Sequence, residues 1–279
     1  MSLTDFQRAV CRVIAAARIA GGEKYVAGGS VLNELLQARR VSHDLDLFHD
    51  TRDALLSAWQ GDRTALESAG YVVRVLREYA SFFEAEVRKG GESVILQWAQ
   101  DSAYRFFPLV EHADFGVTLH PFDLATNKVL ALVGRLEVRD WIDVMKCHES
   151  LQPFGYLAWA ASGKDPGVNP AFILEQASRS AHYTREEVAT LDFGGAVPDA
   201  AALSREWRMM LGEAARMVEI LPEEHVGTCV TDKSGNLFRG GLAELAKALK
   251  TDALHFHKGS LRGAWPRLLD GAMGKPPLT

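Results

Sequence analysis

Gly28-Gly29-Ser30 and Asp44-Leu45-Asp46-Leu47-Phe48, separated by thirteen residues, are the two segments that indicate the fold most clearly. The apolar run Tyr25-Val26-Ala27 before the glycines predicts a short strand, and the glycines permit a tight turn with close backbone approach. Ser30–Leu36 is predicted as a helix with Ser30 at its N-cap. The free amides and the positive dipole end of such a helix form an anion site, which above a diglycine turn can hold a phosphate.

Asp44 and Asp46 are one residue apart, so on a strand they project from the same face while Leu45 and Leu47 point into the core. Two adjacent carboxylates repel each other unless a cation lies between them. Mg²⁺ suits this position because it prefers oxygen ligands and is commonly bound by one or two carboxylates together with substrate phosphates. The two segments together therefore predict a site for a metal-bound nucleoside triphosphate.

Each segment alone has a plainer interpretation. Gly-Gly-Ser turns are common, and a lone Asp-x-Asp on an edge strand is usually a solvated face. Arg39 and Arg40, just before the strand, can meet phosphate or structural carboxylates, or simply face solvent. The combination is what favours a functional site.

A second segment carries charged residues at suggestive spacing. Phe122–Leu132 is predicted as an amphipathic helix with one lysine, Lys128, and Arg139-Asp140-Trp141-Ile142-Asp143 follows it. The plain interpretation is that Asp140 caps a helix starting at Trp141 and that Asp143 pairs with Arg139 four residues before it. The alternative is that these groups serve the phosphate site.

These residues resemble the DNA polymerase β-like nucleotidyltransferases, whose signature is Gly-Ser followed by Asp-x-Asp. With Arg39 and Ser42 between the two parts, the sequence is most similar to the AbiEii/AbiGii abortive-infection toxin family, the transferase halves of bacterial toxin–antitoxin pairs. That family shows the same order of a lysine followed by Arg-Asp-x-x-Asp.

The resemblance implies a role for each matching position. Asp44 and Asp46 would hold Mg²⁺, with Mn²⁺ as an alternative, and Lys128 would neutralise the charge of the triphosphate. Asp140 or Asp143 would support the catalytic centre or orient Lys128 and Arg139. The implied nucleotide-binding positions are Gly28, Gly29, Ser30, Arg39, Lys128 and Arg139.

The third carboxylate departs from the superfamily pattern. There, a strand antiparallel to the Asp-x-Asp strand supplies another acid, as a metal ligand or as the base that takes the proton from the attacking hydroxyl. Val94–Asp101 resembles that strand, but Gln97 stands at the aligned position. Glutamine can coordinate or donate a hydrogen bond but cannot take a proton at neutral pH. Asp101, Glu84 or Glu86 could replace the acid. The alternative is that this protein is a catalytically impaired copy of such an enzyme.

Composition agrees with an ordinary globular protein. Of its residues, 47% are hydrophobic and 24% are charged. The length of 279 residues exceeds that of one average domain. The net charge of −5 argues against non-specific coating of nucleic acid. Three cysteines without metal-ligand spacing suit a reduced cytosol. The first twenty residues carry charges through their apolar positions, so we expect an amphipathic helix, no signal peptide, no membrane span and a soluble, cytoplasmic protein.

The expected fold is α/β (α+β): a nucleotidyltransferase fold with a short mixed sheet flanked by helices over residues 1–120, then a mainly helical portion over 121–279 that completes the cleft. Beyond the site, residues 71–77, 81–88 and 93–99 are predicted as a meander with a turn at Gly90-Gly91. Residues 228–238 are predicted as a short hairpin. The further helices are predicted over 4–20, 51–69, 172–181, 185–191, 200–221 and 242–249.

The carboxyl-terminal part gathers basic and aromatic residues that could hold an RNA backbone and stack a base, or could be solvated lysines around a small core. These residues are Lys247, Lys250, His255, Phe256, His257, Lys258, Arg262, Trp265 and Arg267. Neither histidine has partner ligands in the sequence, so surface or phosphate contact is expected for both.

The leading hypothesis is transfer of a nucleoside monophosphate from an NTP to RNA, with tRNA as the acceptor that the toxin resemblance implies and a cognate antitoxin as an implied partner. A second hypothesis is modification of a protein side chain or a small molecule. A third is a non-catalytic nucleotide-binding module, for which Gln97 is the best argument.

Overall fold

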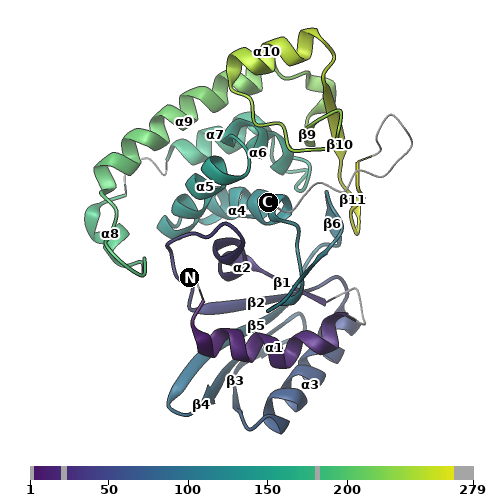
Figure 1. Ribbon diagram of the computed structural model, residues 1–279, viewed down its shortest axis with the longest axis vertical. Coiled ribbons are helices and arrows are strands. Elements are labelled where there is room, and N and C mark those ends of the chain that lie inside the picture. Colours follow the sequence, from purple (N-terminus) through teal and green to yellow (C-terminus); the bar gives the residue numbers. More distant parts are fainter. Residues whose placement is uncertain (1–2, 20–23, 180–182, 267–279) are drawn as a thin grey trace. The chain divides into compact units, whose positions relative to one another are not determined.

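The computed structural model describes residues 3–19, 24–179 and 183–266 (Figure 1). The chain forms two compact units. The first unit comprises Met1–Ala103, Leu109–His120 and Asp192–Gly195, and the second comprises Tyr104–Pro108, Pro121–Leu191 and Ala196–Thr279. The boundary predicted at residue 120 is one of the points where the chain passes between units, but two short segments, residues 104–108 and 192–195, lie in the other unit than that prediction gives them.

A seven-stranded mixed sheet with the order β3-β4-β5-β2-β1-β8-β7 forms the centre of the first unit. β1 pairs antiparallel with β2 and parallel with β8, while β2 pairs parallel with β5. The strands are β1 Lys24–Ala27, β2 Asp44–His49, β3 Val72–Tyr79, β4 Phe82–Lys89, β5 Glu92–Gln100, β7 Val110–His112 and β8 Gly116–Thr118. The expected fold class, a mixed sheet flanked by helices, is confirmed.

Two helices, α1 (Asp5–Ile19) and α3 (Arg52–Ser68), pack on the sheet of the first unit (Figure 1). Leu47 and Trp98 pair across β2 and β5 and are fully buried beneath them, as the alternation of polar and apolar residues predicts. The indole of Trp98 donates a 2.9 Å hydrogen bond to Asp62 of α3, which satisfies a buried polar group. Helices therefore cover this face, and the opposite face carries the alternate side chains of each strand.

The predicted meander is confirmed, with one correction to its attachment. β3, β4 and β5 are antiparallel neighbours, and Gly90 and Gly91 form the turn between β4 and β5 with positive φ angles. β5, however, runs parallel to β2, so the expected antiparallel arrangement with the Asp-x-Asp strand was wrong. Helix α3 lies between β2 and the meander in the chain, and this crossover is what allows parallel pairing.

The second unit is mainly helical, as expected. Its core includes Tyr156, Trp159 and Met217, and α9 packs against α6 and α7 (Figure 1). Its helices are α4 Pro121–Arg135, α5 Val138–Ser150, α6 Phe154–Ala161, α7 Pro170–Ser178, α8 Arg185–Ala189, α9 Ala200–Ile220, the 3₁₀ turn η1 Glu223–His225 and α10 Leu242–Lys250. Two small antiparallel sheets pair β9 Thr228–Asp232 with β10 Leu254–Lys258, and β6 Tyr104–Arg105 with β11 Ser260–Leu261.

The predicted hairpin over 228–238 is only partly present. The carboxylate of Asp232 accepts hydrogen bonds from the amides of Ser234 and Asn236, which closes the turn. Beyond it, a single bridge joins Thr231 to Leu237, and the strand partner of β9 is β10 instead. Three predicted positions lie outside the described residues: Ala20 at the end of the first helix, Ala181 at the end of the helix predicted over 172–181, and Arg267 in the carboxyl-terminal part. No helix that the structure describes has the length and apolar character needed to cross a membrane.

Candidate nucleotide and metal site

The junction between β1 and α2 (Gly28–Leu35) lies directly against the Asp-x-Asp strand. Gly28 has a φ of +77°, a conformation that favours glycine. A Cβ atom added to it would lie 2.7 Å from Cγ of Asp46 and nearer still to the carboxylate oxygen Oδ2. Both backbone angle and space therefore require glycine here, and the Asp46 carboxylate occupies the volume that a side chain would take.

Ser30 has a different role from the predicted one. Helix α2 begins at Gly28 with Ala27 at its N-cap, so Ser30 lies inside the first turn and the expected N-cap role was wrong. Its side chain is fully buried, and its hydroxyl donates a hydrogen bond to the backbone carbonyl of Asp44. Ser30 thus joins the helix to the start of β2, next to Gly29, which is also buried.

Asp44 and Asp46 lie half-buried on one face of β2, while Leu45 and Leu47 are fully buried on the other. The alternation expected of this strand is therefore present. Two carboxylates on one face, one of them packed against a glycine turn, supply the oxygen ligands that suit Mg²⁺. Within the described residues, no group of three or more His, Cys, Asp or Glu side chains forms a metal cluster, so the remaining ligands would come from phosphates, water or neutral groups.

Gln97 lies on the strand next to Asp46, although this strand is parallel to β2 and not antiparallel as expected. It stands directly opposite Asp46 in the parallel pairing of β5 with β2. Its Nε2 donates a 3.0 Å hydrogen bond to Oε1 of Glu84, which lies opposite it on β4 and is 5% exposed. The other Glu84 oxygen pairs with Nε of Arg77 at 2.8 Å. An amide and a buried acid thus follow Asp46 across the two neighbouring strands.

The other acids considered for this role lie in different settings. Glu86 pairs with Arg74 and Arg88, and the hydrogen bond from Arg88 lowers its pKa. Asp101 follows the end of β5, four residues beyond Gln97, which is about 13 Å along a strand. Its carboxylate accepts a hydrogen bond from the amide of the next residue. The structure therefore does not bring Asp101 to the Asp44–Asp46 pair, which argues against its predicted catalytic role.

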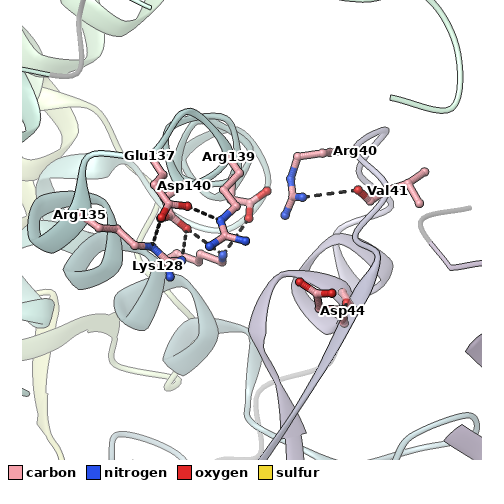
Figure 2. A network of polar contacts seen from close by, with 10 residues as sticks. Arg40, Val41, Asp44, Lys128, Arg135, Glu137, Arg139 and Asp140 are labelled. Atoms are coloured by element: carbon pink, nitrogen blue, oxygen red, sulfur yellow. Dashed lines mark hydrogen bonds and ion pairs between the residues drawn. The ribbon is translucent and has the colours of Figure 1, made fainter. Parts of the chain in front are cut away.

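The two arginines before β2 differ in exposure. Arg39 is exposed, whereas Arg40 is 5% exposed and its guanidinium donates to the carbonyl of Val41 at 3.5 Å (Figure 2). The exposed Arg39 is compatible with a phosphate contact and equally with solvation.

The second unit holds the other predicted residues in a buried ionic cluster, shown in Figure 2. Nζ of Lys128, on α4, lies 2.9 Å from Oδ1 of Asp140 and 3.1 Å from Oδ2 of Asp143. Arg135 donates to both oxygens of Asp140, at 2.6 and 2.9 Å. Asp140 and Asp143 are fully buried and Lys128 is 8% exposed. The plain interpretations were therefore wrong, because α5 begins at Val138 and Asp143 pairs with Lys128.

Electrostatics in this cluster favour the ionised acid. Burial alone would raise the pKa of Asp140, but the hydrogen bond from Arg135 and the charge of Lys128 outweigh it, so the pKa lies below its ordinary value. Asp140 also stands in the first turn of α5, where the helix dipole favours a negative charge. Arg139 pairs with Glu137 at 2.5 Å. The ion pairs with Asp140 and Asp143 hold the Lys128 ammonium in one place.

The carboxyl-terminal basic group is only partly available to a ligand. Its lysines and Arg262 are exposed. His257, in contrast, is buried, and its Nε2 lies 2.8 Å from the carbonyl oxygen of Phe106. The predicted surface position of this residue was therefore wrong. Phe256 stacks on His225 at 4.0 Å between ring centroids, and Trp265 packs on Phe107. These two aromatic rings are engaged within the second unit.

Arg77 and Arg135 are the residues that the sequence reasoning did not assign. Arg77 holds Glu84, and the one available signal was its place opposite Glu84 in the predicted meander. Arg135 holds Asp140, and its position at the end of the lysine helix was a signal that could have been followed.

Comparison with known proteins supports the fold. No protein-family model matches the chain, and no curated protein matches it. A solved structure from H. pylori described as a "putative nucleotidyltransferase" has a TM-score of 0.51 at 16% identity, covering 79% of this chain and 100% of that chain. JHP933 from Helicobacter pylori has a TM-score of 0.49 at 14% identity, covering 78% of this chain and 95% of that chain. The first similarity shows a nucleotidyltransferase-like fold.

Proposed function

We propose that this protein is a divalent-metal-dependent nucleotidyltransferase that moves a nucleoside monophosphate from an NTP to an acceptor. The observation that carries the proposal is the packing of the Asp46 carboxylate against Gly28 at the start of α2. It brings an acidic pair and a helix N-terminus together within the first unit, and these are the groups that a cation and a polyphosphate require. The nucleotidyltransferase-like fold supports it.

Each residue of the first unit has a stated task in this proposal. Asp44 and Asp46 would hold Mg²⁺, which neutralises charge on the phosphates and polarises them when bound. The amides at Gly29 and Ser30 would bind phosphate oxygens, and the missing side chain at Gly28 leaves room for the Asp46 carboxylate. The acceptor hydroxyl would attack the α-phosphorus and release its proton to water, the bond from the α-phosphorus to the bridging oxygen would break, and pyrophosphate would leave with that oxygen. Most of the rate then comes from positioning and charge neutralisation.

Lys128, Arg39 and Arg139 are proposed as further phosphate-binding groups on the strength of the sequence resemblance. The buried carboxylates of Asp140 and Asp143 fix the position of the Lys128 ammonium, which is what a group with a positioning task needs. A test is substitution of Lys128 by Met, with NTP affinity as the readout.

RNA is the acceptor we propose first, with tRNA as the leading candidate. The supporting features are the toxin resemblance and the exposed basic residues near the carboxyl end, namely Lys247, Lys250, Lys258 and Arg262. Under this proposal the protein is the toxin of a toxin–antitoxin or abortive-infection pair, it works in the cytoplasm, and an antitoxin is its partner. Modification of a protein side chain or a small molecule is the alternative acceptor chemistry.

The experiment that tests this function is incubation of the full chain with each labelled NTP, Mg²⁺ or Mn²⁺, and total RNA, total protein or small hydroxyl and amine compounds. Label in the RNA fraction supports the first proposal, and label only in protein or small molecules supports the alternative. Asp44→Asn and Asp46→Asn should both remove the label, while Asp165→Asn, an exposed acid of the second unit, should not.

One observation favours a second candidate, a nucleotide-binding module without turnover. Gln97 stands opposite Asp46 and cannot take a proton from an acceptor hydroxyl. This candidate expects NTP binding without label transfer, and it expects expressed Asp46→Asn protein to be as toxic to bacteria as the wild type. Loss of toxicity in a folded Asp46→Asn protein would exclude it.

A further inference from the structure

One row of polar side chains crosses four strands of the sheet in the first unit. In the strand register Asp46 of β2 stands opposite Gln97 of β5, Gln97 opposite Glu84 of β4, and Glu84 opposite Arg77 of β3. Directly paired residues project from the same face of a sheet. The four side chains therefore lie in sequence along one face, from the proposed metal site to the edge of the sheet.

Two contacts fix the orientation of the amide in this row. Nε2 of Gln97 donates to Oε1 of Glu84 at 3.0 Å, and Arg77 binds Oε2 of the same carboxylate at 2.8 Å. An ionised carboxylate only accepts hydrogen bonds, so the nitrogen of the Gln97 amide must face it. Because Arg77 and burial hold Glu84 in place, Gln97 is held as well.

The oxygen of the Gln97 amide is therefore not the atom that faces Glu84, and the strand on the other side of β5 from β4 is β2 with Asp46. Nowhere in the part of the chain that the structure describes does this oxygen accept a hydrogen bond. We propose, on the basis of the proposed function, that Oε1 of Gln97 is a neutral third ligand for the divalent cation held by Asp44 and Asp46. Glu84 is the positioning residue that keeps this oxygen, and not the amide nitrogen, turned to the cation.

This ligand set determines how the cation is acquired. The site has two carboxylates close to the cation, and the third negative charge, on Glu84, lies one strand further away and is paired with Arg77. Fewer charged ligands give weaker binding of a hard cation. The free protein should therefore bind the cation weakly and take it up mainly together with the triphosphate, whose oxygens supply the missing negative charge.

The decisive test exchanges the two side chains, as Glu84→Gln with Gln97→Glu in one chain. The exchange keeps a carboxylate–amide hydrogen bond between β4 and β5 but moves the negative charge one strand, about 4.8 Å, toward Asp46. Titration of the full chain with Mn²⁺, followed by electron paramagnetic resonance without nucleotide, should show at least about ten-fold tighter binding than the wild type. Unchanged Mn²⁺ affinity in a folded exchange variant overturns the proposal.

Single substitutions test the positioning role independently, and they decide the matter if the exchange variant does not fold. Glu84→Gln should weaken Mn²⁺ binding several-fold in the presence of a non-hydrolysable ATP analogue, because the Gln97 amide can then turn its nitrogen to the cation. Glu86→Gln is the matched control: Glu86 lies on the same strand as Glu84 and is also paired with arginine, through Arg74 and Arg88, but it does not contact Gln97. Equal losses in both variants would mean a structural effect and would contradict the proposal.

Asp46→Asn separates this inference from the proposed function. If Asp46→Asn leaves Mn²⁺ binding with the nucleotide analogue unchanged, the proposed function itself fails. If Asp46→Asn abolishes it while the exchange and Glu84→Gln have no effect, only the role assigned to Gln97 and Glu84 fails.

Discussion

The hydroxyl of Ser30 donates a hydrogen bond to the backbone carbonyl of Asp44, fourteen residues further along the chain, and thereby fixes the first turn of α2 against the start of β2. Ser30→Ala removes the buried hydroxyl and leaves the part-buried carbonyl of Asp44 without this donor. We expect a loss of about 1 kcal/mol in the free energy of unfolding, measured by urea denaturation. Ser178→Ala is the control, because that hydroxyl makes an exposed bond within its own helix. Equal effects would show that the Ser30 contact adds nothing.

Gly28→Ala should disrupt nucleotide and metal binding. The added methyl group would overlap the Asp46 carboxylate, and the positive φ angle disfavours alanine. We expect at least about a ten-fold weaker affinity for the metal–ATP complex, a difference of about 1.4 kcal/mol, by isothermal titration calorimetry. Gly61→Ala, inside α3 with nothing within 4 Å, should leave binding unchanged and raise stability by up to about 1 kcal/mol. Unaltered binding in Gly28→Ala would contradict the proposed site.

The contact of Lys128 with Asp140 predicts strong coupling. Lys128→Met removes the ammonium that pairs with two buried carboxylates and should cost about 3 to 5 kcal/mol of unfolding free energy, whereas Asp140→Asn leaves Lys128 paired with Asp143 and should cost less. The double variant should cost less than the sum of the two, because the Lys128–Asp140 interaction is then lost only once. Guanidinium denaturation of the four proteins measures the cycle. An additive result would mean that the pair does not interact in solution.

The lowered pKa of Asp140 makes stability depend on pH in acid. A group whose pKa is depressed by folding stabilises the folded state above its unfolded pKa, about 3.9, and loses this contribution as the pH falls through its folded value. The wild-type protein should therefore lose more stability than Asp140→Asn as the pH is lowered from 5 toward 2. Thermal melts across this range measure the difference, and parallel curves would contradict it.

Asp123 is expected to be a main stabilising residue of the second unit. Its fully buried carboxylate accepts hydrogen bonds from the amides of Phe106 and Phe107 and pairs with Lys164 at 2.8 Å. Asp123→Asn should cost about 3 kcal/mol or more, because the change leaves the lysine charge unpaired and replaces one acceptor by a donor. Asp165→Asn, an exposed acid that accepts one local bond, is the control and should change stability by less than about 0.5 kcal/mol.

The parts of the fold that could be predicted are those with a clear period or clear turn chemistry. The meander follows from alternating residues and the Gly90-Gly91 turn, and α9 follows from a long amphipathic pattern. Helix α6, in contrast, is buried on all sides, so its sequence has no polar face and no helical period. β8 is three residues long, and its place in the sheet depends on its pairing with β1 and β7, which a local pattern does not reveal.

The candidate site shows the same division. The spacing of Asp44 and Asp46 predicted their common face, because a strand fixes it locally. The direction of β5 and the pairing of Glu84 with Gln97 depend on the order of strands in the sheet, which no short segment determines. The plain interpretation of Asp143 was wrong because Lys128, fifteen residues earlier on another helix, was the stronger partner for a buried acid.

The path of the backbone has an evolutionary consequence. The chain leaves the first unit after Ala103, comes back at Leu109, and comes back again at Asp192, so neither unit is one uninterrupted stretch. No single crossover between two related genes can exchange one whole unit and spare the other. We therefore expect homologous chains to be inherited as complete blocks, with few natural hybrids that join the amino half of one lineage to the carboxyl half of another.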